Sequence, residues 1–100
     1  MKVNVNAVSF TADRKLIDFI QQRMTKLEKY YDKIVSSDVF LKVVKTSDKE
    51  NKIVEIKIHV PGDDFLVKKQ CKTFEEATEL SAESLERLLV KRKEKIRTHV

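Results

Sequence analysis

The amino-acid sequence predicts a single α+β domain over residues 1–100, in which a four-stranded sheet carries two helices on one face. Hydrophobic residues recur with the period of a strand in four segments and with that of a helix in two, in the order β-α-β-β-β-α. Three of the strands follow one another through short turns, and both helices lie outside that run. This order is typical of an antiparallel-rich sheet with both helices packed on the same side.

The first strand and the first helix occupy the N-terminal third. Val3, Val5 and Ala7 alternate with polar residues, as in a half-buried strand. Thr11 then has the side chain of an N-cap, and we expect a helix over about residues 12–32. The apolar residues of this helix recur at helical spacing: they are Leu16, Ile20, Met24, Leu27, Tyr31 and Ile34.

Three further strands follow this helix. A short polar stretch at residues 36–38 introduces the second strand, which alternates through residues 39–44. A charged turn leads to the third strand, over residues 53–60, whose alternation is the most regular in the chain. Pro61-Gly62-Asp63-Asp64 predicts a hairpin turn. The fourth strand begins at Phe65, and its pattern fades at residues 68–70, which is typical of a sheet edge.

The closing helix begins at a predicted capping box, Thr73-Phe74-Glu75-Glu76. Its apolar face is expected to consist of Phe74, Thr78, Ser81, Leu85, Leu89 and Ile96. Residues 74–86 carry five glutamates and no base, whereas residues 87–97 carry six basic residues, Arg97 among them, and one glutamate. The helix dipole favours one or two such charges at each end. Six basic residues on a chain of net charge +5 go further, and indicate a bound polyanion.

Basic side chains form two stripes beside the predicted apolar faces. The stripe on the closing helix consists of Arg87, Lys91 and Lys95, and the stripe on the first helix consists of Phe19, Arg23, Lys26 and Tyr30. Basic residues interleaved with aromatic rings suit RNA, because cations hold phosphates and rings stack on bases. The stripes would border one groove if the helices lie side by side. In the alternative interpretation, the rings belong to the rim of the core and the lysines are merely solvated, as we expect for Lys29.

This sequence lacks the residues that several other classes of protein require. One glycine cannot build a glycine-rich phosphate loop, and neither His59 nor His99 has a nucleophile or carboxylate at a catalytic spacing. Cys71 is expected to be a small buried residue, and His59 a solvated or cross-strand one. We therefore expect no enzyme, no cofactor and no metal site. No apolar run approaches the roughly 20 residues that span a bilayer, and a single cysteine without a signal-peptide pattern fits the cytoplasm.

Two segments and one turn resemble a known family. Residues 23–34, Arg-Met-Thr-Lys-Leu-Glu-Lys-Tyr-Tyr-Asp-Lys-Ile, resemble a Lys-Leu-Glu-x-Tyr/Trp segment that ends a first helix. Residues 85–96, Leu-Glu-Arg-Leu-Leu-Val-Lys-Arg-Lys-Glu-Lys-Ile, resemble a closing Leu-x-Arg-Gln-Leu-x-Lys-x-Lys stretch. The turn at residues 60–62 also matches, and the likeness runs almost without gaps over residues 3–99. The family is that of the ribosome hibernation-promoting factors and ribosome-associated inhibitors, in its short form.

The resemblance implies a fold similar to double-stranded-RNA-binding domains and a site on the small ribosomal subunit, between head and platform. A protein bound there overlaps mRNA and the A- and P-site tRNAs, and silences idle ribosomes under stress or in stationary phase. The resemblance also implies that Arg23 and Lys26 on the first helix, and Arg87 and Lys91 on the second, form the rRNA-binding surface. Lys93 and Lys95 would extend it.

This sequence departs from the family pattern at three positions. The family usually has Lys at the position of Ser84, Gln at that of Leu88 and often Tyr at that of Glu75, so the basic stripe is one turn shorter here. We expect a non-enzymatic translation inhibitor that is monomeric off the ribosome. Two alternatives stay open: a general module for structured RNA, and a domain whose basic face docks an acidic partner protein.

Overall fold

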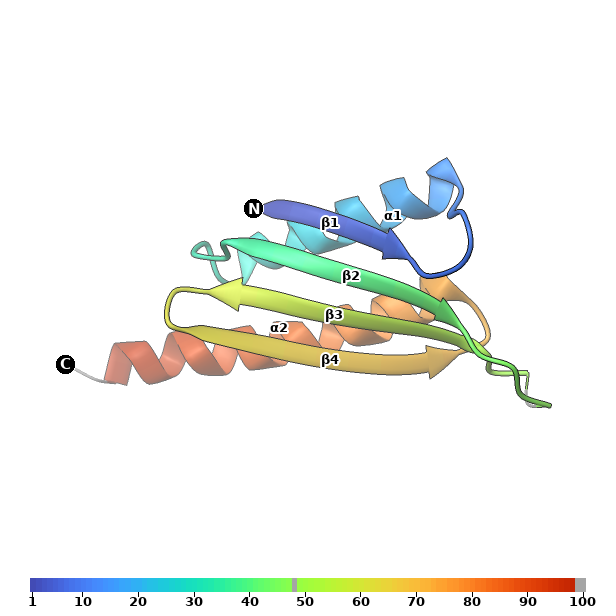
Figure 1. Cartoon of the computed structure of the whole chain (residues 1–100). Coiled ribbons are helices and arrows are strands. Elements are labelled where there is room, and N and C mark those ends of the chain that lie inside the picture. The colour runs from blue at the N-terminus through green and yellow to red at the C-terminus, as the bar shows by residue number, and fades with distance from the viewer. Residues whose placement is uncertain (48, 99–100) are drawn as a thin grey trace.

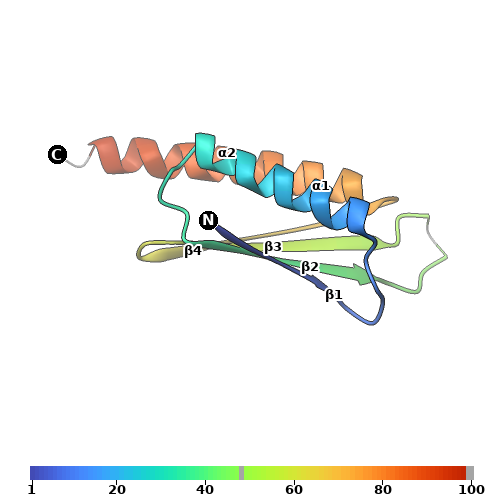
Figure 2. The same cartoon turned by 90° about the horizontal axis from the view of Figure 1, so that it is seen from above.

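The computed structural model describes residues 1–47 and 49–98, with side chains through residue 95, and confirms the predicted α+β fold (Figure 1). The elements are β1 (Lys2–Ala7), α1 (Arg14–Thr25), the short 3-10 helix η1 (Lys26–Lys29), β2 (Ser36–Val43), β3 (Lys52–Val60), β4 (Asp63–Cys71) and α2 (Phe74–Thr98). The strands form one sheet in the order β1-β2-β3-β4, with β1 parallel to β2 and the other pairs antiparallel. Both helices cover the same face of it (Figure 2).

The first helix differs from the prediction at both ends. Its N-cap is Asp13, not Thr11, because the Asp13 carboxylate accepts a hydrogen bond from the backbone N–H of Leu16 at 2.8 Å. The α-helical turns end at Thr25, and the chain continues as the tighter η1. The spacing of apolar residues could not reveal this change from an α-helix to a 3-10 helix. A single turn of either kind leaves Leu27 and Tyr31 on the buried side.

The strands are longer than the sequence pattern indicated. β2 already begins at Ser36, and β4 pairs with β3 along its whole length instead of fading. Its position at the edge of the sheet is as predicted. The turn between β3 and β4 contains Pro61 and Gly62 alone, while Asp63 and Asp64, expected in the turn, open β4. Gly62 has φ +80°, the left-handed conformation that the third residue of a type II turn requires.

The core lies between the sheet and the two helices. We call α1 and η1 together the first helical segment. Inward residues of β2 and β3 pack against Ile20, Met24 and Leu27 of this segment and against Leu85 and Leu89 of α2. The predicted apolar face of α2 is confirmed at Phe74, Thr78, Ser81, Leu85 and Leu89; Ile96 lies outside the described side chains. The N-cap half of the predicted capping box is present, with the Thr73 hydroxyl accepting from the backbone N–H of Glu76 at 3.1 Å. The last turns of α2 project beyond the β3–β4 turn (Figures 1 and 2).

Candidate nucleic-acid interface

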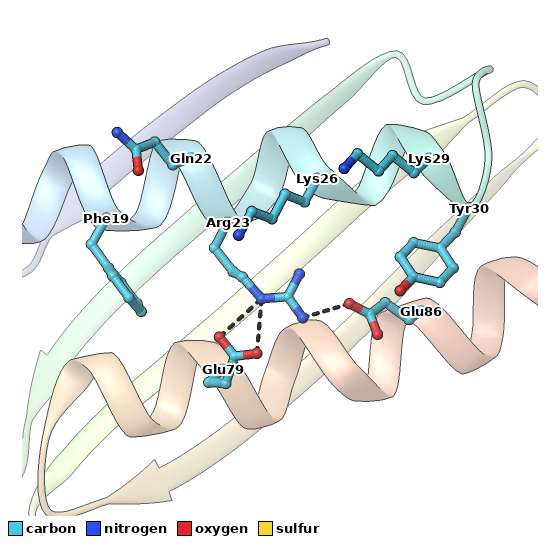
Figure 3. Close-up of a pocket in the computed structure, with 8 residues that line it drawn as sticks. All are labelled: Phe19, Gln22, Arg23, Lys26, Lys29, Tyr30, Glu79 and Glu86. Atoms are coloured by element: carbon cyan, nitrogen blue, oxygen red, sulfur yellow. Dashed lines mark hydrogen bonds and ion pairs between the residues drawn. The ribbon is translucent and has the colours of Figure 1, made fainter.

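A groove runs between the first helical segment and α2, on the side of the helices away from the sheet. One hollow of about 370 Å³ is lined by Phe19, Gln22, Arg23, Lys26, Lys29, Tyr30, Glu79 and Glu86 (Figure 3). A second hollow, also of about 370 Å³, is lined by Tyr30, Glu86, Arg87, Val90 and Lys91. The two hollows are adjacent, because Tyr30 and Glu86 line both, and we call the two together the groove. The structure therefore places the first-helix stripe and two members of the α2 stripe, Arg87 and Lys91, at the same groove.

Arg23 reaches across this groove to α2 (Figure 3). Its Nε donates to both carboxylate oxygens of Glu79, at 3.0 and 2.9 Å, and a terminal guanidinium nitrogen donates to Glu86 at 2.5 Å. Partial burial acts to lower the pKa of Arg23, but the hydrogen bonds with Glu79 and Glu86 outweigh it and leave that pKa raised. The Arg23 side chain is only 11% exposed. Arg23 therefore ties α1 to α2 and is not an exposed cation like its neighbours.

The sequence contained a signal for this contact. Glu79 and Glu86 are seven residues apart, which places both on the same side of α2. We read the glutamates of α2 as one half of a divided charge pattern, and missed that two of them would face an arginine on the neighbouring helix.

Four other cations at the groove are exposed: Lys26, Lys29, Arg87 and Lys91. Within residues 1–47 and 49–95, none of the four forms an ion pair. Arg87 donates a hydrogen bond to the neutral hydroxyl of Ser84, at 3.2 Å. Lys29 was expected on a solvated side of the helix. The winding of η1, about 120° per residue instead of 100°, turns it by roughly 60° toward the groove.

Lys93 and Lys95 do not extend the groove as one surface. Lys95 lies on the β4 side of α2, at a hollow of about 220 Å³ whose other lining residues are Asp63, Phe65, Leu88, Lys91 and Arg92. Lys93 is also exposed. Two residues along a helix correspond to a rotation of about 200°. The two lysines therefore point to nearly opposite sides of the projecting end of α2. Leu88, where the family usually has Gln, packs against the core instead of reaching out.

Arg92 belongs to the basic cluster in the sequence but has a structural partner. It donates to the carbonyl of Pro61 at 2.7 Å and to the carboxylate of Asp63 at 3.3 Å, and so fastens α2 to the β3–β4 turn. The side chain of Arg97 lies outside the described residues. The number of basic residues near the end of the chain therefore overstated the number that is exposed for a ligand.

The histidine on the open face of the sheet is a cross-strand residue, as expected. The two ring nitrogens of His59 lie 3.0 Å from Asp38 on β2 and 2.7 Å from Asp64 on β4, and Asn4 donates to Asp38 at 2.9 Å. The carboxylates of Asp38, with the larger effect, and of Asp64 accept hydrogen bonds from the His59 ring and raise the pKa of His59. Hydrogen bonds donated by Asn4, with the larger effect, and by His59 lower the pKa of Asp38. His99 lies outside the described residues.

Cys71, at the end of β4, is buried as predicted, and this burial raises the pKa of its thiol. Among the described residues, no group of three or more histidine, cysteine or carboxylate side chains could hold a metal ion. Over the same residues, the structure contains no helix with the length and hydropathy required to cross a membrane.

Comparison with known proteins gives consistent matches over almost the whole chain. Residues 3–97 match the family model described as Sigma 54 modulation protein / S30EA ribosomal protein. The ribosome hibernation promoting factor of Azotobacter vinelandii is 30% identical over 95 residues, which is 95% of this chain and 85% of that protein. The protein of the same name from Pseudomonas putida is 28% identical over 95 residues, covering 95% of this chain and 89% of the relative.

Two solved structures share the fold. A ribosomal subunit interface protein from Coxiella burnetii superposes with a TM-score of 0.82 at 17% identity, over 93% of this chain and 98% of the other. The N-terminal domain of Protein Y from Thermus thermophilus gives a TM-score of 0.80 at 16% identity, over 91% and 98%. At these identities the likeness establishes the fold, including the position of both helices on one face of the sheet.

Proposed function

Because the chain belongs to the Sigma 54 modulation protein / S30EA ribosomal protein family, we propose that it is a ribosome hibernation factor. It binds the rRNA of the small ribosomal subunit in the channel that mRNA and tRNA occupy, and inhibits translation under stress or in stationary phase. It acts in the cytoplasm, as a monomer when off the ribosome and without catalysis. Support comes from relatives named ribosome hibernation promoting factor, which align over 95% of this chain.

The groove between the helices carries the mechanism. Lys26 and Lys29 from one side, and Arg87 and Lys91 from the other, present four exposed positive charges without carboxylate partners among the described residues. Phosphates of folded rRNA can therefore bind them without displacing an internal ion pair. The rest of the domain then fills the space that mRNA and tRNA would need. This pairing of cations from both helices is the observation on which the proposal depends.

The number of these cations sets the expected salt dependence. Each phosphate contact contributes roughly 0.7 to 0.9 to the slope of log affinity against log salt. Four contacts predict a loss of affinity of roughly 50- to 150-fold between 50 and 200 mM salt. A much steeper slope would mean that residues outside the groove also hold phosphates.

Charge reversal tests the proposal directly. We expect Arg87→Glu combined with Lys91→Glu to abolish co-sedimentation with small subunits and to leave the fold intact by circular dichroism. A matched control reverses two exposed lysines on the strands, Lys2→Glu with Lys68→Glu, which makes the same change in net charge. The control should bind like the unaltered chain. Equal loss in both double variants would show that net charge, and not the groove, governs binding.

A competition assay separates ribosome binding from general RNA binding. Small subunits and naked RNA duplex compete for labelled protein on a filter, and we expect the subunits to win by a large factor. Equal affinity for the two would favour the general RNA-binding module. Binding that survives complete digestion of the RNA would favour an acidic protein partner.

A further inference from the structure

The second hollow of the groove contains exposed apolar side chains. Tyr30, the C-cap of η1, and Val90 of α2 are each 37% exposed, and both line the second hollow. The next residue, Tyr31, is 5% exposed and belongs to the core. Of two consecutive tyrosines, one therefore fills the core and the other keeps its ring at the surface, where it is available to a ligand.

Around α2, the residues of this hollow change from a charge-compensated glutamate and an apolar side chain on the inner side to exposed cations on the outer side. At 100° per residue, Glu86, Val90, Arg87 and Lys91 follow one another round the helix in steps of about 40° to 60°. Glu86 lies at the inner end of this series, where Arg23 compensates its charge. Arg87 and Lys91 lie at the outer end, toward solvent. A ligand that suits this order has a neutral planar part inside and negative charges outside.

A nucleotide of unpaired RNA has this distribution of charge. Its base is neutral and presents a flat face to the Tyr30 ring, and in adenine, cytosine and guanine it carries an amino group that can donate to a carboxylate such as Glu86. Its flanking phosphates can reach Arg87 and Lys91 at the rim. An acidic peptide fits less well, because its acidic side chains have no flat ring to stack on Tyr30 and their carboxylates would lie beside the carboxylate of Glu86. The volume of about 370 Å³ is within the range of small-ligand sites.

We propose that Tyr30 and Val90 form a stacking site for one unpaired nucleobase, whose flanking phosphates are held by Arg87 and Lys91. This inference rests on the proposed function and specifies which part of the RNA enters the groove: a single-stranded, unstacked nucleotide together with its flanking phosphates. Tyr30 supplies the stacking surface, Val90 the opposite wall, and the two cations the attachment of the strand.

The test compares RNA with and without bases. Binding of the whole chain is measured for a ten-nucleotide oligoadenylate and for an abasic backbone of the same length. Tyr30→Leu removes the contribution that stacking on one aromatic ring makes to binding affinity. It should therefore weaken oligoadenylate binding by roughly 5- to 150-fold. The same variant should bind the abasic strand as the unaltered chain does. Its salt dependence should also be unchanged, because the substitution removes no charge.

Two controls keep this result interpretable. Tyr30→Trp retains a ring and should retain binding, and its indole fluorescence should be quenched by oligoadenylate, since the chain has no other tryptophan. Phe40→Leu makes the same type of change on the half-buried outward side of β2 and should leave binding unaltered. Unchanged oligoadenylate binding in Tyr30→Leu, an equal loss on the abasic strand, or effective competition by polyglutamate would overturn the inference.

Sedimentation with small subunits, measured in parallel, distinguishes this inference from the proposed function. If the unaltered chain sediments with subunits but shows no preference for bases, the stacking site is wrong and the function stands. If the chain prefers bases through Tyr30 but does not sediment with subunits, the stacking site stands and the ribosomal function is wrong.

Discussion

Replacing Arg23 by methionine should destabilise the fold, because Arg23 joins the two helices. The substitution keeps most of the aliphatic stem and removes the guanidinium that holds Glu79 and Glu86. Both carboxylates then remain at the groove without their partner and repel each other. Two pieces of information set the size of the effect: how deeply each contact is buried, and the usual free energy of such contacts.

The contact with Glu86 is the stronger of the two. The side chains of Arg23 and Glu86 are 11% and 19% exposed, and a hydrogen bond between charged groups so placed contributes about 1.5 kcal/mol. Glu79 is 45% exposed, where solvent screening leaves about 0.5 kcal/mol. The sum predicts a loss of about 2 kcal/mol in the free energy of unfolding. For a domain of this size, the melting temperature should fall by roughly 8 to 16 °C.

The assay is urea unfolding followed by circular dichroism, with small-subunit binding measured on the same samples. Lys26→Met is the matched control: it removes a cation from the neighbouring turn that has no ion pair among the described residues, and should change stability by less than about 0.5 kcal/mol. Combining Arg23→Met with Glu86→Gln should cost less than the sum of the single variants. If Arg23→Met loses subunit binding at unchanged stability, Arg23 is a phosphate ligand, as the family resemblance implied, and our structural reading is wrong.

Two further substitutions test the sheet. The pKa of His59 is raised above its ordinary value of 6.5, so its stabilising contribution is fully present below pH 6.5 and is lost as the pH rises through the raised value. His59→Gln should remove this part of the pH dependence in urea unfolding between about pH 5 and 9, and an unchanged profile would contradict the assignment. Gly62→Ala should cost about 1 kcal/mol through backbone strain alone, because φ is +80° and, apart from Gly62 itself and its two chain neighbours, no residue has a heavy atom within 4 Å of the added methyl group. Gly62→Asn should cost less, and equal stability of Gly62→Ala and the unaltered chain would exclude the strain.

Much of the fold follows from patterns within short segments. The two-residue period of β3, the helical spacing of Leu16, Ile20 and Met24, and the capping box at Thr73 each depend on residues a few positions apart. Burial of one face per element determines these patterns, so they are legible without knowledge of the tertiary structure. The errors fell at element ends, such as the cap at Asp13, where several polar residues could take the same role.

The sequence alone determined the order of the elements, their buried faces and the presence of basic stripes on both helices, since each of these is encoded locally. Only the tertiary structure decided which charges are exposed. Arg23 meets Glu79 across 56 residues and Arg92 meets Asp63 across 29, and both pairings depend on how α2 lies against α1 and β4. The same packing leaves Lys26, Lys29, Arg87 and Lys91 exposed at the groove, without an ion pair to any side chain that the structure describes. The physical reason is that an ion pair forms over a few ångströms in space, and no periodicity within one segment reports that distance.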